Sequence, residues 1–203
     1  MNYLIGVSGK AGHGKDSVVS FLKQCLVEDY GSGNVEYVDI KFADKLKEIT
    51  ADLLDVLPWY MNDQAGKETG IEHMGGITGR RALQIIGTDV ARSIYQDVWV
   101  YHYMDKVTDY FASIVTIPDS VFVFTSDVRF KNEYDAVKKY EGSLNVKPIL
   151  IRVVRPGFNI GHGVNHLSET QLDDVNDWDY KLVAENLTEL GKQTREIYES
   201  IIS

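Results

Sequence analysis

The amino-acid sequence predicts an α/β fold built on one sheet of five parallel strands, with helices on both faces. Three observations predict it. Short apolar segments rich in β-branched and aromatic residues alternate with segments of helical periodicity. The chain has 203 residues, which suffices for one domain with a full core and a small insertion. A glycine-rich turn stands between the first strand candidate and the first helix candidate.

The strand candidates are short segments enriched in residues that favour a pleated, buried surface. The five candidates are residues 3–8, 35–41, 121–125, 149–154 and 180–183. Because helical segments separate them, we expect the strands to run parallel.

Two helices are well marked. The first is expected directly after the glycine-rich turn, and its apolar residues share one face: Val18, Leu22, Cys25 and Leu26. The last can be capped by Asn186, and Glu189 can complete a capping box. Its expected apolar stripe comprises Leu187, Leu190, Ile197 and Ile201.

Residues 42–113, between the second and third strands, form a long helical stretch that is too large for a simple crossover. We therefore expect an insertion. Its second half places Leu83, Ile86, Val90 and Ile94 at helical spacing. Residues 156–165 contain four glycine and proline residues between a strand and a helix, which predicts a mobile loop.

Composition excludes several classes of protein. Cys25 is the only cysteine, so neither an internal disulfide nor a cysteine-rich zinc site can form, and a reducing cytoplasm is expected. The net charge of -9 disfavours stable binding to nucleic-acid backbones. Apolar runs are too short to span a bilayer, and the first residues resemble a strand, so we expect neither membrane insertion nor export. Small-molecule nucleotides are the expected partners, and a homodimer is left open.

Residues 9–15 match the G-x-x-x-x-G-K pattern of a phosphate-binding loop, in the strand–loop–helix context that this motif requires. Glycines let backbone N–H groups turn toward phosphates, the helix N-terminus adds partial positive charge, and the lysine can reach the β- and γ-phosphates. The alternative is a glycine-rich turn with an exposed lysine. We predict nucleotide binding by Gly9, Lys10, Ala11, Gly12, His13, Gly14, Lys15, Asp16 and Ser17.

Asp16 departs from the common loop pattern, which has serine or threonine at this position to offer a hydroxyl to magnesium. Ser17 follows, but a helix rotates by about 100° per residue, so Ser17 does not inherit the geometry of position 16. Two interpretations stay open. Asp16 binds the metal directly or through water, or it caps the helix.

Asp127 follows the apolar run 121–124 and falls at the carboxyl end of a strand, where open α/β sheets bind ligands. Its carboxylate could hold magnesium or orient the acceptor. Arg129 could neutralise charge on the transferred phosphoryl group. The alternative is a surface ion pair at a strand end.

Two groups of arginines suit phosphate binding. Arg80 and Arg81 at a predicted helix start, with Arg92 further along, could bind an acceptor phosphate in bidentate fashion. Arg152 and Arg155 flank the loop 156–165, as arginines on a closing lid would. For each of them, solvated surface charge is the alternative.

His162 and His166 have a spacing seen in metal sites, but no glutamate completes an H-E-x-x-H pattern. A lid or capping role is favoured over zinc.

Taken together, these residues make the sequence resemble the bacteriophage deoxynucleoside monophosphate kinases, a branch of the P-loop nucleotide kinases. The resemblance covers most of the chain. It rests on Gly14-Lys15-Asp16 and on FADKLK at 42–47, GRRALQIIGTDVAR at 79–92, DVRFKNE at 127–133 and HLSE at 166–169. Such kinases share the aspartate after the loop lysine.

The resemblance implies a single P-loop domain over residues 1–203, with a helical nucleotide-monophosphate-binding insertion at 57–93 and a short lid at 155–168. It implies transfer of the γ-phosphoryl group of ATP to a dNMP, giving dNDP and ADP, with Mg²⁺ as cofactor. The implied compartment is the cytoplasm, that of the host for a phage-encoded enzyme. The expected catalytic residues are Lys15, Asp127, Arg129 and Arg155; the expected substrate-binding residues are Lys41, Arg80, Arg81, Gln84 and Arg92; the expected metal ligands are Asp16 and Asp127.

Three alternatives compete with this prediction. A kinase of another phosphorylated metabolite would share the donor site and differ only in its acceptor pocket. A GTP-dependent switch would need a D-x-x-G string, and residues 63–66 match it, but they do not follow a buried strand and no N-K-x-D signature occurs. A non-catalytic nucleotide-binding module would bind ATP without acceptor-dependent release of ADP.

Overall fold

The computed structural model describes residues 1–31, 35–114, 120–140, 145–158 and 167–203. The chain divides into two compact units. The first comprises residues Met1–Lys41 and Val107–Ser203, and the second comprises Phe42–Lys106. The expected insertion, residues 57–93, falls within the second unit.

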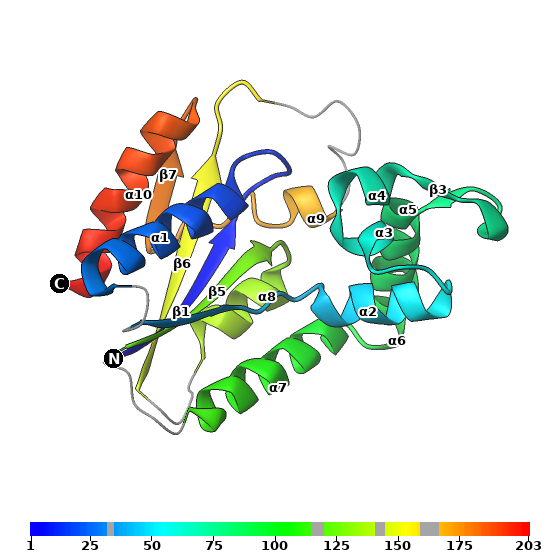
Figure 1. Ribbon diagram of the computed structural model, residues 1–203, viewed down its shortest axis with the longest axis horizontal. Coiled ribbons are helices and arrows are strands. Elements are labelled where there is room, and N and C mark those ends of the chain that lie inside the picture. The colour runs from blue at the N-terminus through cyan, green and yellow to red at the C-terminus, as the bar shows by residue number, and fades with distance from the viewer. Residues whose placement is uncertain (32–34, 115–119, 141–144, 159–166) are drawn as a thin grey trace. The chain divides into compact units, whose positions relative to one another are not determined.

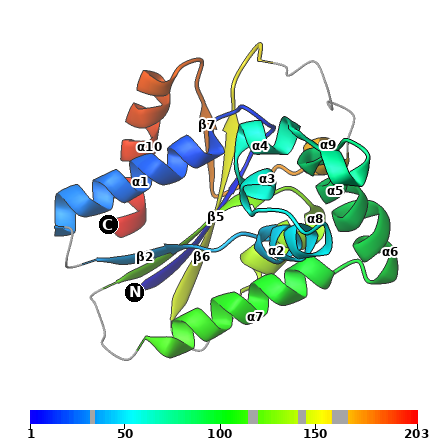
Figure 2. The same ribbon diagram turned by 45° about the vertical axis from the view of Figure 1, so that its right-hand side comes forward.

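A parallel sheet of five strands forms the first unit (Figure 1). Its order is β2-β5-β1-β6-β7, with β2 at one edge and β7 at the other (Figure 2). The strands are β1 (Asn2–Ser8), β2 (Glu36–Asp39), β5 (Val121–Val128), β6 (Val146–Val154) and β7 (Tyr180–Val183). The α/β fold and all five predicted strands are confirmed, although β5 continues beyond the expected end at residue 125.

Strand β1 lies at the centre of the sheet, where Tyr3 pairs with Phe122 of β5 on one side and with Lys147 of β6 on the other. The strands that follow β1 first build the sheet on the β5 side and then on the β6 side, so the strand order reverses at β1. Open parallel sheets bind ligands at such a point, beyond the carboxyl ends of the strands. The glycine-rich loop leaves β1 at this end.

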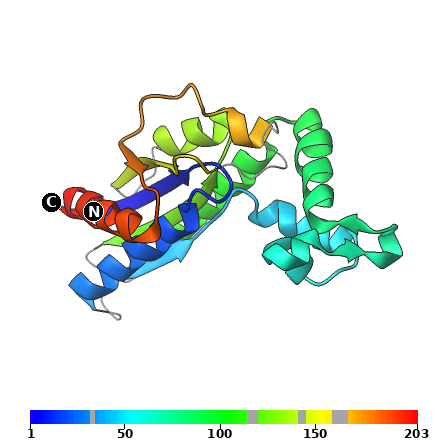
Figure 3. The ribbon, with the colours of Figure 1, turned by 90° about the horizontal axis from the view of Figure 1, so that it is seen from above.

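Helices cover both faces of the sheet (Figure 3). Helices α1 (Lys15–Tyr30) and α10 (Leu187–Ile202) pack against each other on one face, and α8 (Lys131–Lys138) packs against β1 and β6 on the other. The short helix α9 (Leu167–Thr170) also belongs to this unit. Because both faces are covered, the strands read as nearly continuous apolar runs. The predicted apolar face of α1 is buried in the core: Val18, Leu22, Cys25 and Leu26.

The start of α10 differs in two details from the prediction. Asn186 caps the helix, since its side chain accepts a hydrogen bond from the backbone N–H of Glu189 at 3.0 Å. Glu189, however, accepts from the backbone N–H of Glu185 at 2.9 Å rather than from that of Asn186, so the expected capping box is displaced by one residue. Leu187, the first residue of the helix, is 61% exposed and does not join Leu190 in the core.

The second unit is mainly helical, as expected, but it also contains a short antiparallel strand pair that the sequence did not reveal. Strands of two residues are too short to show alternation of apolar and polar side chains. The elements are α2 (Asp44–Leu53), α3 (Trp59–Asn62), α4 (Gln64–Glu68), β3 (Gly70–Ile71), the 3₁₀-helix η1 (Glu72–Met74), β4 (Ile77–Thr78), α5 (Gly79–Gln84), the π-helix η2 (Ile85–Ala91) and α6 (Arg92–Ile94). Helix α7 (Val98–Ser113) begins in this unit and ends in the first.

The π-helix explains why part of the expected apolar stripe is wrong. Val90 is 48% exposed and Ile94 is 80% exposed, whereas Leu83 packs against the small core of this unit. A π-helix bonds residue i to i+5, so the 3.6-residue period that placed all of them on one face is lost after Gln84. The indole N–H of Trp99 donates to the carbonyl oxygen of Gly87 at 2.9 Å and satisfies one carbonyl of this segment.

Among the helices of the described residues, none combines the length and the apolar character that crossing a membrane requires.

Candidate phosphate-binding site

Residues 9–14 connect β1 to α1 in a loop whose shape requires glycine. Gly12 and Gly14 have φ angles of 76° and 96°, in the left-handed region that other residues avoid. A Cβ atom on Gly9 would stand 2.7 Å from the carbonyl oxygen of Val153 in β6, and one on Gly14 would stand 2.9 Å from Leu190 in α10. The loop therefore packs closely against both β6 and α10.

The loop ends at the N-terminus of α1, a helix of 16 residues. Gly14 holds the N-cap position and has no side chain with which to satisfy the free amides of the first turn. Those amides and the helix dipole favour a bound anion. The predicted strand–loop–helix arrangement is present, and it provides the backbone donors that a phosphate needs.

Lys15 is buried, with 7% of its surface exposed, and its ammonium group donates to the carbonyl oxygen of Lys10 at 3.0 Å. Burial and, to a smaller extent, the positive charge of Arg129 lower the pKa of Lys15 to about 8, although nearby carboxylates, Glu169 foremost, oppose this shift. The lysine thus lies against its own loop and not on the surface, which excludes the alternative of an exposed lysine.

Asp16 is the second residue of α1, so Gly14 and not Asp16 takes the N-cap position. The Asp16 carboxylate accepts hydrogen bonds from the Ser126 hydroxyl at 2.6 Å and from the Lys41 ammonium at 3.1 Å. Burial would raise the pKa of Asp16, but the hydrogen bond from Ser126 and the charge of Lys41 outweigh it and lower that pKa. Asp16 therefore carries a negative charge beside the loop, and its position does not support the capping interpretation.

Asp127 lies near the carboxyl end of β5, one residue before Val128, which pairs with Ser8 at the end of β1. Burial alone would lower the pKa of Lys41, but its contact with Asp16 and the negative charge of Asp127 together raise this pKa. Asp127 opposes the lowering of the Lys15 pKa in the same way. Lys15, Asp16, Lys41 and Asp127 thus form one electrostatic cluster near the carboxyl ends of the strands.

The two carboxylates of this cluster suit a hard cation. Magnesium is usually bound in proteins by one or two carboxylates, and phosphate oxygens and water complete its coordination. Within the described ranges of the chain, no group of three or more His, Cys, Asp and Glu residues forms a metal site of its own. Asp16 and Asp127 are the two carboxylates of this cluster that could hold such a cation.

Arg129 is fixed where β5 passes into α8. The buried Glu133 carboxylate accepts hydrogen bonds from the backbone N–H groups of Arg129 at 2.8 Å and of Phe130 at 3.1 Å. This explains why the DVRFKNE segment ends in glutamate. The Arg129 guanidinium in turn donates to Glu169 at 2.5 Å.

Glu169 is a site residue that sequence reasoning missed. Its carboxylate also accepts from the backbone N–H of Ala11, in the phosphate loop, at 2.7 Å. The HLSE segment had contributed to the resemblance but suggested no role, because no local pattern connects residues 158 positions apart.

Further ion pairs join the same acidic segment to the loop and to β6. Asp173 accepts from Lys10 at 2.8 Å and from Arg152 at 2.9 Å. Arg152 also donates to the Ser8 hydroxyl at 2.9 Å. Arg152 thus lies at the loop, where its partners are the Asp173 carboxylate and the Ser8 hydroxyl.

Arg155 approaches the loop through His13, whose Nδ1 accepts from the Arg155 backbone N–H at 3.3 Å. The Arg155 guanidinium donates to the Glu185 carbonyl at 3.3 Å and lies 4.4 Å from the centre of the Phe158 ring. Burial lowers the pKa of His13, so its imidazole is a neutral acceptor at neutral pH. His162, His166 and most of the expected lid lie outside the described residues.

The expected acceptor residues of the second unit do not form a described pocket. Arg80 pairs with Glu68 at 2.6 Å, and Arg92 donates to the Gln96 carbonyl at 3.2 Å. Arg81 is exposed at the start of α5, and Gln84 at the end of α5 is half-buried. Lys41 belongs to the first unit and, as described, pairs with Asp16.

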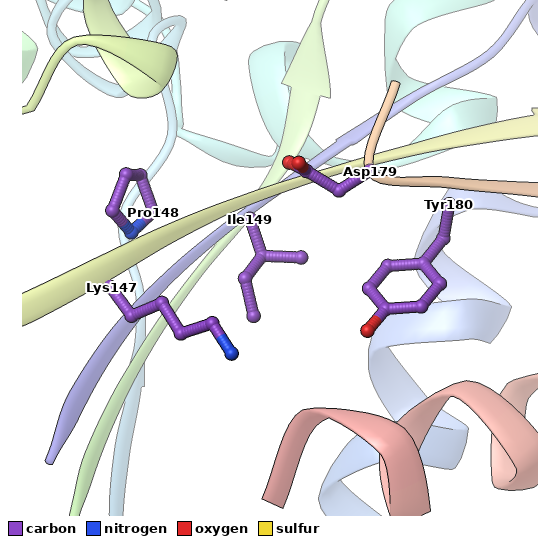
Figure 4. A pocket seen from close by; sticks show the side chains of 5 residues that line it. All are labelled: Lys147, Pro148, Ile149, Asp179 and Tyr180. Atoms are coloured by element: carbon purple, nitrogen blue, oxygen red, sulfur yellow. The ribbon is translucent and has the colours of Figure 1, made fainter. Parts of the chain in front are cut away.

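A separate pocket in the first unit does not involve the phosphate loop (Figure 4). Its lining residues are Lys147, Pro148, Ile149, Asp179 and Tyr180. Lys147 lies near the amino end of β6, whereas ligands of parallel sheets bind at the carboxyl end. This pocket therefore supports no role in phosphate binding.

Comparison with known proteins is consistent with the geometry of the loop. The chain is similar to the "Putative deoxynucleotide monophosphate kinase" of Acanthamoeba polyphaga mimivirus, with 29% identity over 209 residues, covering 98% of this chain and 94% of the relative. No protein-family model matches the chain. The similarity supports a kinase-type enzyme over nearly the whole length. It does not support the expected bacteriophage origin, since this relative comes from a mimivirus.

Proposed function

We propose that this chain is a deoxynucleoside monophosphate kinase that uses ATP and Mg²⁺. The observation that carries the proposal is the phosphate loop at the strand-order reversal, with the buried Lys15 folded against it. The similarity to a protein named as a deoxynucleotide monophosphate kinase supports the choice of acceptor.

In the proposed reaction, a phosphate oxygen of the dNMP attacks the γ-phosphorus of ATP. The bond between that phosphorus and the oxygen that bridges it to the β-phosphate breaks, and ADP leaves with the electron pair. Loop amides and Lys15 stabilise the negative charge that grows on the β- and γ-phosphates. We assign Arg129, whose backbone N–H donates to Glu133 of α8, the role of neutralising charge on the transferred group.

When bound, a magnesium ion would neutralise negative charge on the phosphates of the donor. Asp16 and Asp127 are the residues that would hold it, directly or through water. Ser126 and Lys41 keep the Asp16 carboxylate in place and ionised.

The acceptor is proposed to bind through Lys41, Arg80, Arg81, Gln84 and Arg92, with Arg155 assisting in catalysis. Guanidinium groups suit the dNMP phosphate because they can donate two parallel hydrogen bonds to it. We propose that the substrates are free nucleotides in the cytoplasm and that no stable nucleic-acid complex forms.

A coupled assay of ADP formation across deoxy- and ribonucleoside monophosphates tests the function. We expect ADP release that depends on magnesium and on at least one dNMP. Release with a different phosphorylated metabolite and with no dNMP would identify another small-molecule kinase. ATP binding without acceptor-dependent release would identify a non-catalytic binding module and contradict the proposal.

A further inference from the structure

Glu169 makes two contacts with groups that the proposed reaction would direct at phosphate. One carboxylate oxygen accepts from the backbone N–H of Ala11 in the loop at 2.7 Å, and the other accepts from Arg129 at 2.5 Å. The side chain is only 13% exposed, so this arrangement is not a solvated surface ion pair.

A carboxylate and a phosphate have the same needs at such a place. Both are anionic oxygen acceptors, and both are stabilised by backbone N–H groups and by arginine. Glu169 also opposes the lowering of the Lys15 pKa, so its negative charge is felt by the buried ammonium group. The carboxylate thus makes the contacts that a phosphate group at the loop would make.

We infer that Glu169 is an internal competitor for the phosphates of the donor nucleotide, and that its displacement sets the affinity of the donor site. The inference rests on the proposed function, because it takes the loop to be the site of ATP. A carboxylate and a phosphate oxygen cannot share the single N–H of Ala11, so ATP must exchange with Glu169. Arg129 then passes from the carboxylate to the phosphate.

The surrounding segment makes this competition effective. Asp173 is anchored by Lys10 at 2.8 Å and by Arg152 at 2.9 Å, which keeps the chain next to the loop. A tethered group acts at a high effective concentration, typically in the millimolar range for a short connection. Glu169 can therefore compete with nucleotide although a free carboxylate would bind the loop weakly.

The test measures binding of inorganic tripolyphosphate and of ATP to the full chain by calorimetry. Glu169→Gln keeps the size of the side chain and removes its charge, but it introduces an amide N–H. Glu169→Ala removes the charge without introducing that amide. We expect both variants to bind tripolyphosphate and ATP about tenfold more tightly than the wild type, in line with the loss of a charge-assisted competitor. Asp174→Asn is the matched control, since it removes one charge from the same exposed segment and should leave both affinities within about twofold.

Unchanged or weaker binding by both Glu169 variants would overturn the inference, because a residue that merely supports the loop would weaken binding when replaced. Melting temperatures without ligand show whether the variants are folded. Tripolyphosphate binding needs no acceptor, so its outcome does not depend on whether a dNMP is the acceptor. Failure of the wild type to bind either probe would refute the donor site and this inference together.

Discussion

At the scale of single residues, Lys15 has two properties that an ordinary surface lysine lacks: it is buried, and its pKa is lowered to about 8. A cation without full hydration is poised to exchange its weak carbonyl contact for a phosphate. Lys15→Ala should therefore reduce turnover by about a hundredfold or more while the fold is retained. Steady-state kinetics and circular dichroism check this. Lys192→Ala, an exposed substitution on α10, is the control, and wild-type turnover in Lys15→Ala would refute the donor-site assignment.

The same pKa predicts a pH dependence of stability. The Lys15 pKa is about 8 in the folded protein and near 10.5 in the unfolded chain, so the unfolded chain binds more protons between these values. The free energy of unfolding should therefore rise from pH 8 to 10.5 by up to ~3 kcal/mol from this group. Urea unfolding across this range, compared with Lys15→Met, isolates the effect because the variant lacks it. Parallel curves for both proteins would show that Lys15 does not titrate there.

Asp16 predicts a dependence on magnesium. Asp16→Asn keeps the shape of the side chain but removes a full negative charge beside the proposed cation. Turnover should fall at low magnesium and recover in part as magnesium is raised. Ser126→Ala should shift the titration in the same direction but less, since Ser126 supports the carboxylate and the negative charge itself remains on Asp16. A titration of Asp16→Asn that superimposes on the wild type would leave Asp127 as the principal ligand.

The residues of the loop could be predicted because seven consecutive positions encode its shape: glycines where φ is positive or where β6 comes close, and a lysine at the helix start. The partners of those residues could not be predicted in the same way. Ser126 and Glu169 reach the loop from distant segments, and only the folded sheet and α9 bring them to Asp16 and Ala11.

At the scale of elements, the strands and long helices were predictable because each repeats one periodicity over several residues. The elements of the second unit were harder to predict. Its strands have two residues each, and its π-helix interrupts the helical period, so neither pattern is long enough to detect.

Helix α10 gives a test at this scale. Asn186→Ala removes a cap and should reduce the free energy of unfolding by about 1 kcal/mol. Leu187→Ala should change it by less than about 0.5 kcal/mol, because this leucine is 61% exposed. Urea unfolding distinguishes the two. A larger loss for Leu187→Ala would restore the sequence-based stripe and contradict the observed packing.

At the scale of the whole molecule, the chain has two compact units, and the proposal assigns the donor loop to the first and all acceptor residues except Lys41 to the second. Arg81→Ala, or Arg80→Ala, should raise the KM for dNMP about tenfold or more with little change in ATP affinity. Arg80 already pairs with Glu68, so Arg81 is expected to show the larger effect. Kinetics with each substrate varied in turn provide the measurement. Reduced ATP affinity with unchanged dNMP kinetics would show that the second unit does not hold the acceptor.

The close approach of Gly14 to Leu190 has a consequence for the newly made protein. The ribosome synthesises the phosphate loop early and α10 late, yet the loop packs against α10 in the folded chain. If the loop holds the triphosphate of ATP as proposed, a nascent chain that still lacks α10 lacks one wall of the loop and should hold it less tightly. Nucleotide retention would thus depend on the synthesis of α10, and truncation within α10 should weaken it although every loop residue is present.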